Sequence, residues 1–481
     1  MIGPRISPGP GSHSSPRRAA GALAAFVAVA LPLLSLAAPA KAQVVEDRFP
    51  GVSLELISEG TRALPFAIQP FAAPPGREDL AQRAENIAAR NLRYSNRFQV
   101  LDSLPSSITR GSEVDYALWD QVGAAFLLTG RIEVSGNRVE LVTEVHDVIY
   151  RERRGQGRFA LPGVDTPEFR MAVHAASDAA VEWATGEPGM AASRIVFSRL
   201  GEGGNRELWV VDSDGENLRR LTNHGNLALT PAWSPDGRRI AFTSFVSGLP
   251  RIYELDLATN RERQVPAPRS GDYITPAYAP DGQTLAFAIT GSSGRSGLYT
   301  YNIGRECCFT TLIESRNEDL SPTFSPDGRR IAFMSNRLGV GAPQIYLMPA
   351  GGGQAEILSP YRFDRRGYYS SPDWSPRGDR VAYYGRIDRI GWHQILISEV
   401  GRGNRILQLT PNQSGNNEDP SWAPDGRHLV FTNGSGRGGA TSLRIVDAVT
   451  GNTRTLVSGM DVKYPDWSPS LARLVTAVDD R

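Results

Sequence analysis

The sequence contains few residues of the kinds that carry catalysis or bind metals. Its two cysteines, Cys307 and Cys308, are adjacent, which excludes CxxC zinc sites and a framework of long-range disulfides. We expect the two thiols to stay free on or beside a strand, and the alternative is that they join in a small ring. The six histidines are isolated, with no HExxH pattern, and no Gly-x-Ser-x-Gly sequence occurs. We therefore predict no catalytic residue, no cofactor and no metal ligand.

The chain also lacks an excess of charge of either sign. Its formal net charge is +1, and the first 42 residues carry four basic side chains and no acidic one, which leaves the rest at −3. A nearly neutral protein has no strong electrostatic attraction to nucleic acid or to anionic lipid. We therefore predict no nucleic-acid partner.

Long apolar runs are missing apart from one, residues 19–38, which directly follows Arg17 and Arg18. After it comes Ala40-Lys-Ala42, with the small residues of a signal-peptidase site. This order predicts a signal peptide over residues 1–42 and export of the remainder. The alternative is a membrane anchor, which the alanine content of the run and its proline disfavour. No other run has spanning length, so we predict no direct membrane insertion.

Glycine and proline are plentiful instead, with 49 and 34 residues, and they favour many short strands joined by turns. One pattern of proline, a variable residue, an aromatic residue and a turn occurs six times, as in Pro231-Ala-Trp-Ser-Pro-Asp-Gly237. The aromatic residues of the six copies lie 45 to 50 residues apart. They are Trp233, Tyr278, Phe324, Trp374, Trp422 and Trp467. This is the period of a propeller blade.

Each repeat has the local chemistry of a four-stranded blade. In Ser-Pro-Asp-Gly the proline presets φ, the aspartate bonds to nearby backbone and the glycine suits the last turn position. A buried strand such as Ile240–Phe242 follows, and then an alternating strand such as Ile252–Leu257. One blade cannot bury both its faces, so six stack in a ring. The repeats predict a six-bladed β-propeller of four-stranded antiparallel blades over residues 189–481.

The ends of this segment indicate how the ring closes. Strands expected at Ile195–Phe197, Leu208–Val211 and Arg219–Leu221 precede the first motif and lack an inner strand. The last motif, Pro465–Ser468, supplies one, so N- and C-terminal strands are predicted to close the ring. Leu474–Val478 competes with Ile195–Phe197 for the second strand of this blade, and the sequence does not decide between them.

Residues 61–188 predict a small α/β domain ahead of the propeller. Strands are expected at 64–71, 98–101 and 125–129, followed by a hairpin around Gly136-Asn137. Two helices are expected from apolar residues at helical spacing, one including Leu80, Ala84, Ile87 and Ala88, the other running over Phe169–Ala184 to Gly186 and Pro188. The fold class is thus α+β multi-domain. Residues 43–60, ahead of this domain, are expected to form a loosely attached strand.

These features together resemble the TolB family of the bacterial Tol-Pal envelope system, over essentially the whole chain from residue 43. Three local sequences sharpen the resemblance: Leu64-Pro-Phe-Ala-Ile-Gln-Pro-Phe71, Ala176-Ser-Asp178 with Thr185-Gly186, and Lys463-Tyr-Pro-Asp-Trp-Ser-Pro469. Arg377 departs from the pattern, because it replaces the aspartate of the fourth turn, and the chain after Ser470 departs as well.

The resemblance implies a periplasmic, non-enzymatic protein that is monomeric when free. It implies docking of Pal, the peptidoglycan-associated lipoprotein, on the propeller, and of TolA, an inner-membrane-linked protein, through the N-terminal segment. Outer-membrane integrity and constriction during cell division are the implied outcome. In the family that segment is either free or packed on the body, and Pal binding influences which. Because residues 43–60 are longer and differ in sequence, a switch here is a hypothesis.

The loops at one rim of a propeller surround its channel, and the residue before each motif proline is expected there. We predict that these six contact the Pal-like partner: Thr230, Thr275, Ser321, Ser371, Asp419 and Tyr464. The alternative is that they are loop residues that only set up the strand. For the TolA-like partner the predicted residues are Val44, Val45, Leu54 and Leu56.

The sequence leaves two other functions as alternatives. A carbohydrate- or peptidoglycan-binding propeller would expose aromatic side chains together, and Tyr368, Tyr369 and Trp392 are the candidates. A propeller hydrolase or lyase would place carboxylates in the channel, and Asp373, Asp419 and Asp466 lie beside motif positions. Asp212–Asn217 has part of a calcium-loop pattern, but its Asp-Gly pair favours a hairpin turn.

Overall fold

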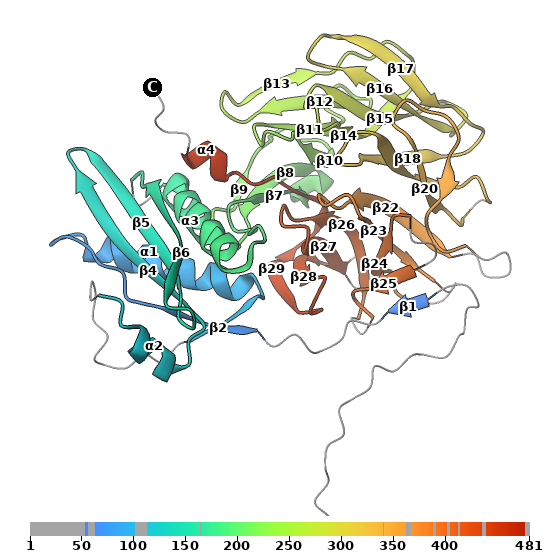
Figure 1. The fold of residues 1–481 in the computed structure, drawn as a ribbon. Coiled ribbons are helices and arrows are strands. Elements are labelled where there is room, and N and C mark those ends of the chain that lie inside the picture. The colour runs from blue at the N-terminus through green and yellow to red at the C-terminus, as the bar shows by residue number, and fades with distance from the viewer. Residues whose placement is uncertain are drawn as a thin grey trace, which may run out of the picture. The chain divides into compact units, whose positions relative to one another are not determined.

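The computed structural model describes residues 53–55, 63–101, 113–163, 166–339, 341–361, 367–387, 391–401, 405–411, 414–434 and 439–476. The predicted signal peptide, residues 1–42, lies outside them. Within the described residues, seven sheets are present: six propeller blades and the sheet of the α/β region (Figure 1). The predicted fold class, a six-bladed propeller after a small α/β region, is therefore confirmed.

The α/β region is built on one five-stranded sheet with the order β3-β2-β4-β5-β6, in which β2 pairs in parallel with both β3 and β4. Its strands are β2 (Leu64–Ile68), β3 (Phe98–Val100), β4 (Phe126–Ser135), β5 (Arg138–Asp147) and β6 (Glu152–Ala160). Its helices are α1 (Glu78–Tyr94), α2 (Tyr116–Val122) and α3 (Pro167–Thr185).

Helices α1 and α3 share one core with the sheet. The predicted apolar face of α1 is buried, and α3 packs against α1, β5 and β6. Thr166 caps α3 by accepting a hydrogen bond from the N–H of Phe169, and Gly186 ends it with a left-handed φ of +73°. Trp119 of α2 packs with Ala67 and Leu127, which alternate along β2 and β4 with residues of that core, so α2 covers the opposite face.

Several elements of this region differ from the sequence predictions. The strand expected at 125–129 continues without a break into the first arm of the hairpin and forms the single strand β4. Helix α2 and strand β6 were not predicted. Asp115 caps α2 through the N–H groups of Ala117 and Leu118, but this helix is only seven residues long and shows no full apolar period. Most of β6 is exposed and polar, so it carries no alternation.

The six blades are numbered here by the order of their inner strands. Blade 1 contains β10 (Ala228–Trp233), β11 (Arg239–Ser244), β12 (Arg251–Asp256) and β13 (Arg261–Gln264). Blade 2 contains β14 (Asp272–Tyr278), β15 (Thr284–Thr290), β16 (Ser296–Asn302) and β17 (Cys307–Ile313). Blade 3 contains β18 (Asp319–Phe324), β19 (Arg330–Ser335), β20 (Gln344–Pro349) and β21 (Glu356–Ile357).

The remaining blades follow the same plan. Blade 4 contains β22 (Tyr368–Trp374), β23 (Arg380–Arg386), β24 (Gln394–Glu399) and β25 (Arg405–Gln408). Blade 5 contains β26 (Asn416–Trp422), β27 (His428–Gly434), β28 (Thr441–Asp447) and β29 (Thr453–Met460). Blade 6 contains β30 (Val462–Trp467), β7 (Arg194–Leu200), β8 (Arg206–Asp212) and β9 (Arg219–Arg220), with the short 3-10 helix η1 (Glu202–Gly204) between β7 and β8.

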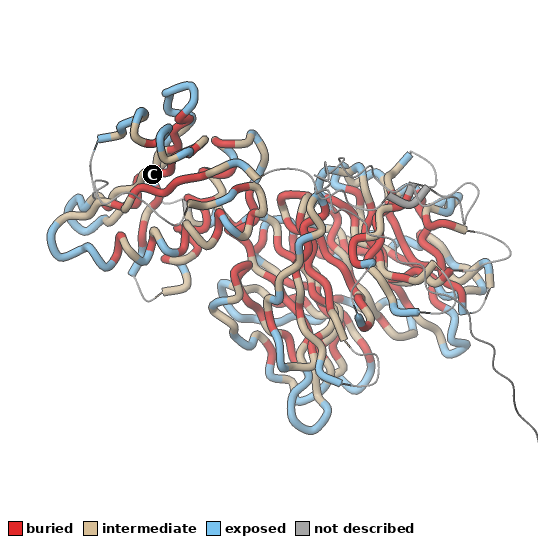
Figure 2. Tube along the Cα trace, turned by 90° about the horizontal axis from the view of Figure 1, so that it is seen from below, coloured by how far each residue is buried: buried red, intermediate tan, exposed pale blue. Residues whose placement is uncertain are grey.

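The core of the propeller contains equivalent buried side chains in each blade, as the repeated sequence predicts. Each second strand buries one aromatic side chain completely, and the six are Phe197, Phe242, Phe287, Phe333, Tyr383 and Phe431. Five of the six motif aromatics are also buried, all but Phe324, which is half-buried. Figure 2 shows the buried residues following the strands, with exposed residues at their connections. The motif aromatics therefore pack the blades and are not available for stacking on a sugar ring.

The ring closes as predicted, because β30 pairs antiparallel with β7. The prediction that Leu474–Val478 could be a second strand is wrong over its described residues, which lie in helix α4 (Ala472–Thr476). The place beside β30 is taken by β7. Leu471 is buried in the core of the α/β region, and α4 packs against α3 and β6.

The N-terminal segment is described over three residues only. These form β1 (Ser53–Glu55), which pairs in parallel with the outer strand β25 of blade 4, Leu54 opposite Ile406. The expected strand is thus present in part. Val44, Val45 and Leu56 lie outside the described residues.

Cys307 and Cys308 are joined in a disulfide at the start of β17, so the expectation of two free thiols is wrong and the alternative, a small ring, is present. None of the helices in the described part of the chain combines the length and apolarity that a membrane crossing requires.

Candidate functional site

The six residues before the motif prolines come together in the propeller channel. All of them line one cavity of about 330 Å³, whose walls are the inner strands of the six blades. Five are half-buried and Asp419 is buried. The ring of positions predicted from the repeats is therefore present, but the residues stand on the channel wall rather than on an exposed rim. We call the set Thr230, Thr275, Ser321, Ser371, Asp419 and Tyr464 the channel ring.

Each channel-ring residue has a left-handed backbone, with φ between +45° for Thr230 and +53° for Tyr464. The cause is a repeated β-bulge, seen in blade 1 where the pairing skips from Leu229 to Ala232 and leaves Thr230 and Pro231 opposite one residue of β11. Left-handed non-glycine residues are strained, and such strain often gathers at ligand sites. Six copies in one channel make this ring the strongest candidate for a functional site.

The polar groups of the channel ring also hold neighbouring blades together. The hydroxyl of Thr243 lies 2.9 Å from that of Thr230 and accepts a hydrogen bond from the N–H of Thr275 at 3.2 Å. The hydroxyl of Thr275 accepts from the N–H of Ser321 at 3.2 Å, and Ser371 donates to Asp419 at 3.0 Å. These contacts give the residues a structural role in holding the blades together, as the alternative interpretation states, and this role is separate from any contact with a partner.

Three carboxyl groups lie in the same channel. Asp466 Oδ2 accepts from the N–H of Trp233 at 2.6 Å, and Asp373 Oδ2 accepts from the N–H of Trp422 at 2.7 Å, so each bridges to the next blade. Burial raises the pKa of Asp373 and of Asp419 to about 6. Burial, with the neighbouring charge of Asp373, raises the pKa of Asp466 to about 8. At neutral pH, Asp466 therefore keeps its proton, while Asp373 and Asp419 are mainly ionised.

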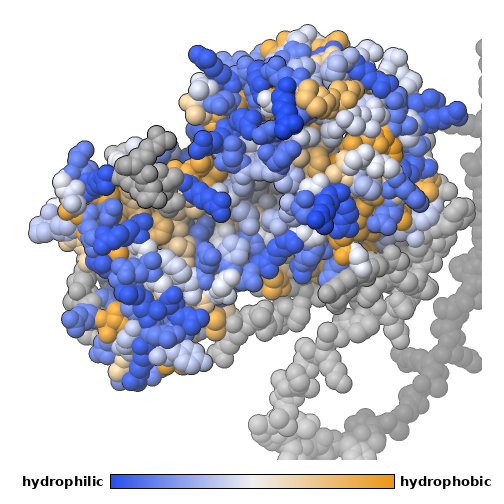
Figure 3. Space-filling view, turned by 45° about the horizontal axis from the view of Figure 1, so that its top comes forward, coloured by the Kyte–Doolittle hydropathy of each residue, from blue (hydrophilic) through white to orange (hydrophobic). Residues whose placement is uncertain are grey.

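Of the three possible catalytic acids, Asp373 and Asp466 thus accept hydrogen bonds from backbone N–H groups of the next blade, and Asp419 accepts one from the hydroxyl of Ser371 of the preceding blade. What the channel offers chemically is a ring of hydroxyl and carboxylate oxygens, suited to accept donors from a docked partner. Figure 3 shows mostly hydrophilic residues on one face of the molecule, with small apolar patches among them.

The aromatic set proposed for carbohydrate binding is not exposed together. Trp392 is 46% exposed, but Tyr369 is only 1% exposed and packs inside blade 4. Tyr368 stacks on His393 with 5.1 Å between ring centroids, and His393 Nδ1 lies 2.7 Å from Glu418. The joint exposure that would support the carbohydrate-binding alternative is therefore absent for these three residues, because consecutive strand residues such as Tyr368 and Tyr369 point to opposite faces.

A second polar cluster lies where the turn between β8 and β9 meets α1 and α3. Asp214 is paired with Arg170, and Arg90 lies 3.6 Å from the same oxygen. Arg194 binds Asp212 at 2.9 Å. The N–H of Gly215 bonds to the carbonyl of Asp212, which confirms the hairpin turn predicted for this sequence. This hairpin joins the propeller to the α/β region through buried charges.

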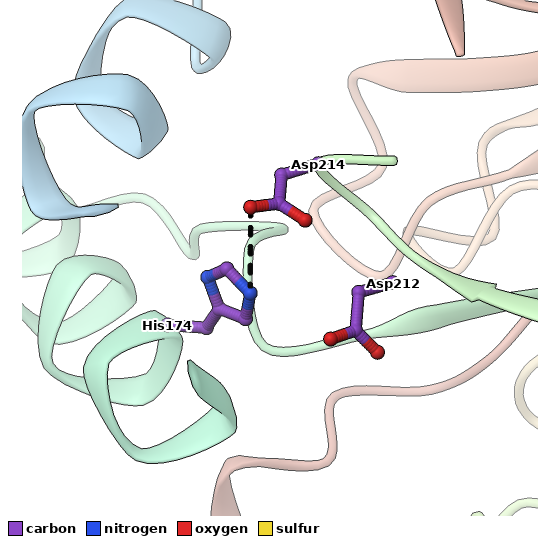
Figure 4. A group of neighbouring side chains, drawn as sticks. All are labelled: His174, Asp212 and Asp214. Atoms are coloured by element: carbon purple, nitrogen blue, oxygen red, sulfur yellow. Dashed lines mark ion pairs between the residues drawn. The ribbon is translucent and has the colours of Figure 1, made fainter. Parts of the chain in front are cut away.

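This cluster also contains the one group of potential metal ligands found among the described residues. His174 points between Asp212 and Asp214, with Nε2 3.9 Å from Asp214 Oδ2 (Figure 4). Asn91 contacts the other ring nitrogen at 2.9 Å, and burial lowers the pKa of His174, which favours the neutral ring. Three guanidinium groups already neutralise the two carboxylates and oppose a further cation. We assign the group to the contact between the two regions.

Three residues that connect neighbouring blades have roles that the sequence does not indicate: Thr243, Ser421 and Arg377. Thr243 follows the buried aromatic of β11, but the equivalent residues are Ala288 in blade 2 and Met334 in blade 3, so the repeats give no signal. Arg377 was noted only as a change of the fourth turn. It donates to the carbonyl of Asp425 at 3.1 Å and pairs with Glu187, so it links blades 4 and 5 to the segment after α3. Ser421, whose hydroxyl accepts from the N–H of Trp467 at 3.0 Å, occupies the variable motif position.

Comparison with known proteins agrees with this architecture. A family model described as the TolB beta propeller domain matches residues 181–471, and one described as the TolB amino-terminal domain matches residues 52–154. A "Protein TolB homolog" of Chlorobium chlorochromatii is 32% identical over 58% of this chain and 62% of its own. A "Tol-Pal system protein TolB" of Nitrosomonas europaea is 34% identical over 46% of this chain and 50% of its own.

The chain thus spans about half to three-fifths of the length of these curated relatives. Among solved structures, TolB from Acinetobacter baumannii superimposes with a TM-score of 0.72 at 24% identity, covering 85% of this chain and 97% of the other. That likeness shows a shared fold.

Proposed function

The chain belongs to the TolB family, and from this premise we propose that it is a non-enzymatic docking protein of a Tol-Pal system. The proposal rests mainly on the channel ring, in which six equivalent residues with strained left-handed backbones line one cavity. It is supported by the match of the two regions of the chain to the two family models. The partner proposed for this ring is a Pal-like, outer-membrane-anchored lipoprotein. The proposal places the mature chain in the periplasm.

The first test measures binding of residues 43–481 to the periplasmic domain of Pal from the same organism. We expect Thr275→Ala and Ser321→Ala to weaken binding at least tenfold in combination, since side chains at the centre of an interface carry most of its energy. Thr311→Ala, on the exposed outer strand of the blade that contains Thr275, is the matched control.

Because Thr275 also bonds to the next blade, the folding of each variant is checked by its thermal unfolding. Folded variants that bind Pal as the parent does would move the site away from the ring. Failure of the folded parent protein to bind Pal would overturn the docking function itself.

We further propose that residues 43–60 bind a TolA-like partner, as Val44, Val45, Leu54 and Leu56 were predicted to do. Strand β1 supports this, because a segment that adds to the edge of blade 4 has the extended form needed to add to another sheet. Because only three of the described residues pair with β25, the segment can leave the edge of blade 4 at little cost and bind a partner instead.

Deletion of residues 43–60 tests the second contact. We expect TolA affinity to be lost and Pal binding to persist, measured by titration calorimetry with each partner. Unchanged TolA affinity after the deletion would contradict the assignment. Loss of both affinities together would point to misfolding, which the unfolding curve of the deletion variant would reveal.

In the cell, docking of both partners would support outer-membrane integrity and constriction at division. A strain that lacks the gene is expected to leak periplasmic protein and to form chains of cells. A gene carrying the combined Thr275 and Ser321 changes should fail to restore either property, while the Thr311→Ala gene should restore both.

A further inference from the structure

The disulfide lies at an irregularity of blade 2. Strands β16 and β17 pair Thr300 with Thr310 and Asn302 with Cys307, which leaves Cys308 and Phe309 opposite the single residue Tyr301. This is a β-bulge, with one more residue on β17 than on its partner. The only two cysteines of the chain are therefore placed where the outer strand departs from regular pairing.

The backbone around the disulfide adopts conformations that usually belong to glycine. Cys308 has a φ of +64° and Glu306 has a φ of +53°, so left-handed residues flank Cys307 on both sides. A bulge with a left-handed first residue normally has glycine there, because an L side chain in that conformation is strained. The covalent ring between adjacent residues restricts how this strain can be released.

The disulfide is accessible. Strand β17 is the outer strand of its blade, Cys308 is exposed and Cys307 is half-buried. A disulfide is opened by attack of a thiolate on one sulfur, and access to the sulfur is a main requirement. Nothing in the fold of the described residues encloses the bond as a core disulfide would be enclosed.

The turn beside the disulfide is attached to the neighbouring blade. Arg263 of β13 lies 3.5 Å from the carboxylate of Glu306 and donates to the carbonyl of Ile303 at 3.3 Å. The same guanidinium binds the buried carboxylate of Glu254 at 2.6 Å. A change in the pairing of Cys307 and Cys308 would move this turn and its contacts between blades 1 and 2.

From these observations we propose that Cys307–Cys308 is a thiol–disulfide exchange site, whose opening by a dithiol releases the bulge and loosens the contact of the β16–β17 turn with blade 1. Once the ring is open, Cys308 can leave the left-handed region and pair with Asn302 in place of Cys307. The inference does not depend on the docking function.

Oxidation of the dithiol balances the reduction of the protein disulfide. One thiolate of the dithiol attacks a sulfur of the pair and forms a mixed disulfide, and the other cysteine leaves as a thiolate that takes up a proton. The second thiol of the reagent then attacks the mixed disulfide. The protein gains two electrons and two protons, and the dithiol is oxidised to its own disulfide.

The first experiment uses the native protein with dithiothreitol as the dithiol. We expect millimolar reagent to raise the number of titratable thiols from zero to two per chain without denaturant, with a mass increase of about two daltons, one for each thiol proton gained. A bond that stays closed until urea is added would overturn the proposal.

The second experiment measures amide hydrogen exchange in peptides covering residues 303–313. On reduction, exchange should rise by roughly five- to thirty-fold, the factor expected when the strain of one left-handed residue drives local opening. Peptides of blade 5 serve as the internal reference.

Two double variants separate the disulfide from the bulge. Cys307→Ser with Cys308→Ser removes the bond and keeps the strain, so it should exchange like the reduced protein whether or not dithiothreitol is present. Cys307→Ser with Cys308→Gly removes both, because glycine accepts the left-handed conformation, and it should exchange like the oxidised protein. Equal exchange rates in the two variants, or no change on reduction of the parent, would refute the conformational part.

Discussion

At the scale of single residues, the carboxyl group of Asp466 shows how the channel controls charge. It lies between the backbone N–H of Trp233 in the next blade and the hydroxyl of Ser421, which is 3.3 Å away. A carboxyl group with its pKa raised to about 8 binds its proton more tightly in the folded chain than in the unfolded chain. Its contribution to stability is therefore full at low pH and declines as the pH rises toward 8.

We expect Asp466→Asn to remove this decline. The amide cannot ionise and keeps an oxygen for the N–H of Trp233, so the variant should melt a few degrees above the parent at pH 9, where the parent carries a buried carboxylate. At pH 4 the two proteins should melt together. Thermal unfolding at both pH values checks this, with the exposed Asp379→Asn as control. Melting curves of parent and variant that stay parallel from pH 4 to 9 would contradict it.

At the scale of elements, the β8–β9 hairpin makes an electrostatic contact between the propeller and the α/β region. Asp214 is almost completely buried and faces Arg170 and Arg90, whereas Glu216, two residues later, pairs with Arg90 at 52% exposure. Breaking a buried ion pair leaves an uncompensated charge, while an exposed pair contributes little. The two acids of one hairpin therefore differ greatly in importance.

Asp214→Asn should lower the free energy of unfolding by about 1.5–3 kcal/mol, the usual contribution of a hydrogen bond to a charged group, because Arg170 and Arg90 are 19% and 37% exposed and stay partly solvated without their partner. It should also speed proteolysis between Gly186 and Ser193, the segment that joins the two regions. Glu216→Gln, the matched control, should change the free energy of unfolding by less than about 1 kcal/mol. Urea unfolding and limited proteolysis measure both effects. Similar losses in the two variants would show that the contact does not depend on buried charge.

At the scale of the whole molecule, stability depends on a strand that joins the two ends of the propeller. Strand β30 supplies the inner strand of blade 6, and Trp467 donates its indole N–H to Ser193 at 2.7 Å across 274 residues of sequence. An open ring would expose the inner face of β7 and one side of blade 1. Closure therefore makes the six blades one cooperative unit.

A chain that ends at Asp461 should unfold at a clearly lower urea concentration, whereas a chain that ends at Thr476 should unfold like the full protein. A synthetic peptide of residues 462–476 added to the shorter chain should restore part of the stability in proportion to its concentration, because it binds only the folded form. A shorter chain with an unchanged urea midpoint would show that the ring does not need β30.

The sequence by itself determined the parts of this protein that depend on local chemistry and on repetition. Ser-Pro-Asp-Gly turns fix where each blade reverses, and the spacing of the aromatic residues fixes six blades. The surplus strand sequences around Ile195 and the final motif at Trp467 fix the closure. The same repetition predicted that the six residues before the motif prolines lie together, because equivalent positions in a symmetric ring meet around its axis, but it placed them at an exposed rim instead of on the channel wall.

Only the tertiary structure decided what depends on residues far apart in the chain. The sequence did not decide whether Leu474 belongs to a strand of blade 6. In the structure β7 pairs with β30 instead, and the neighbouring Leu471 packs in the core of the α/β region. The protonation of Asp466 depends on its enclosure and on Asp373, and the importance of Asp214 depends on Arg170 of a distant helix. The disulfide of Cys307 and Cys308 lies at a bulge in the pairing with β16, which only the assembled sheet shows. The burial of a side chain and its charged partners depend on residues from several parts of the folded chain, so they cannot be read from one repeat.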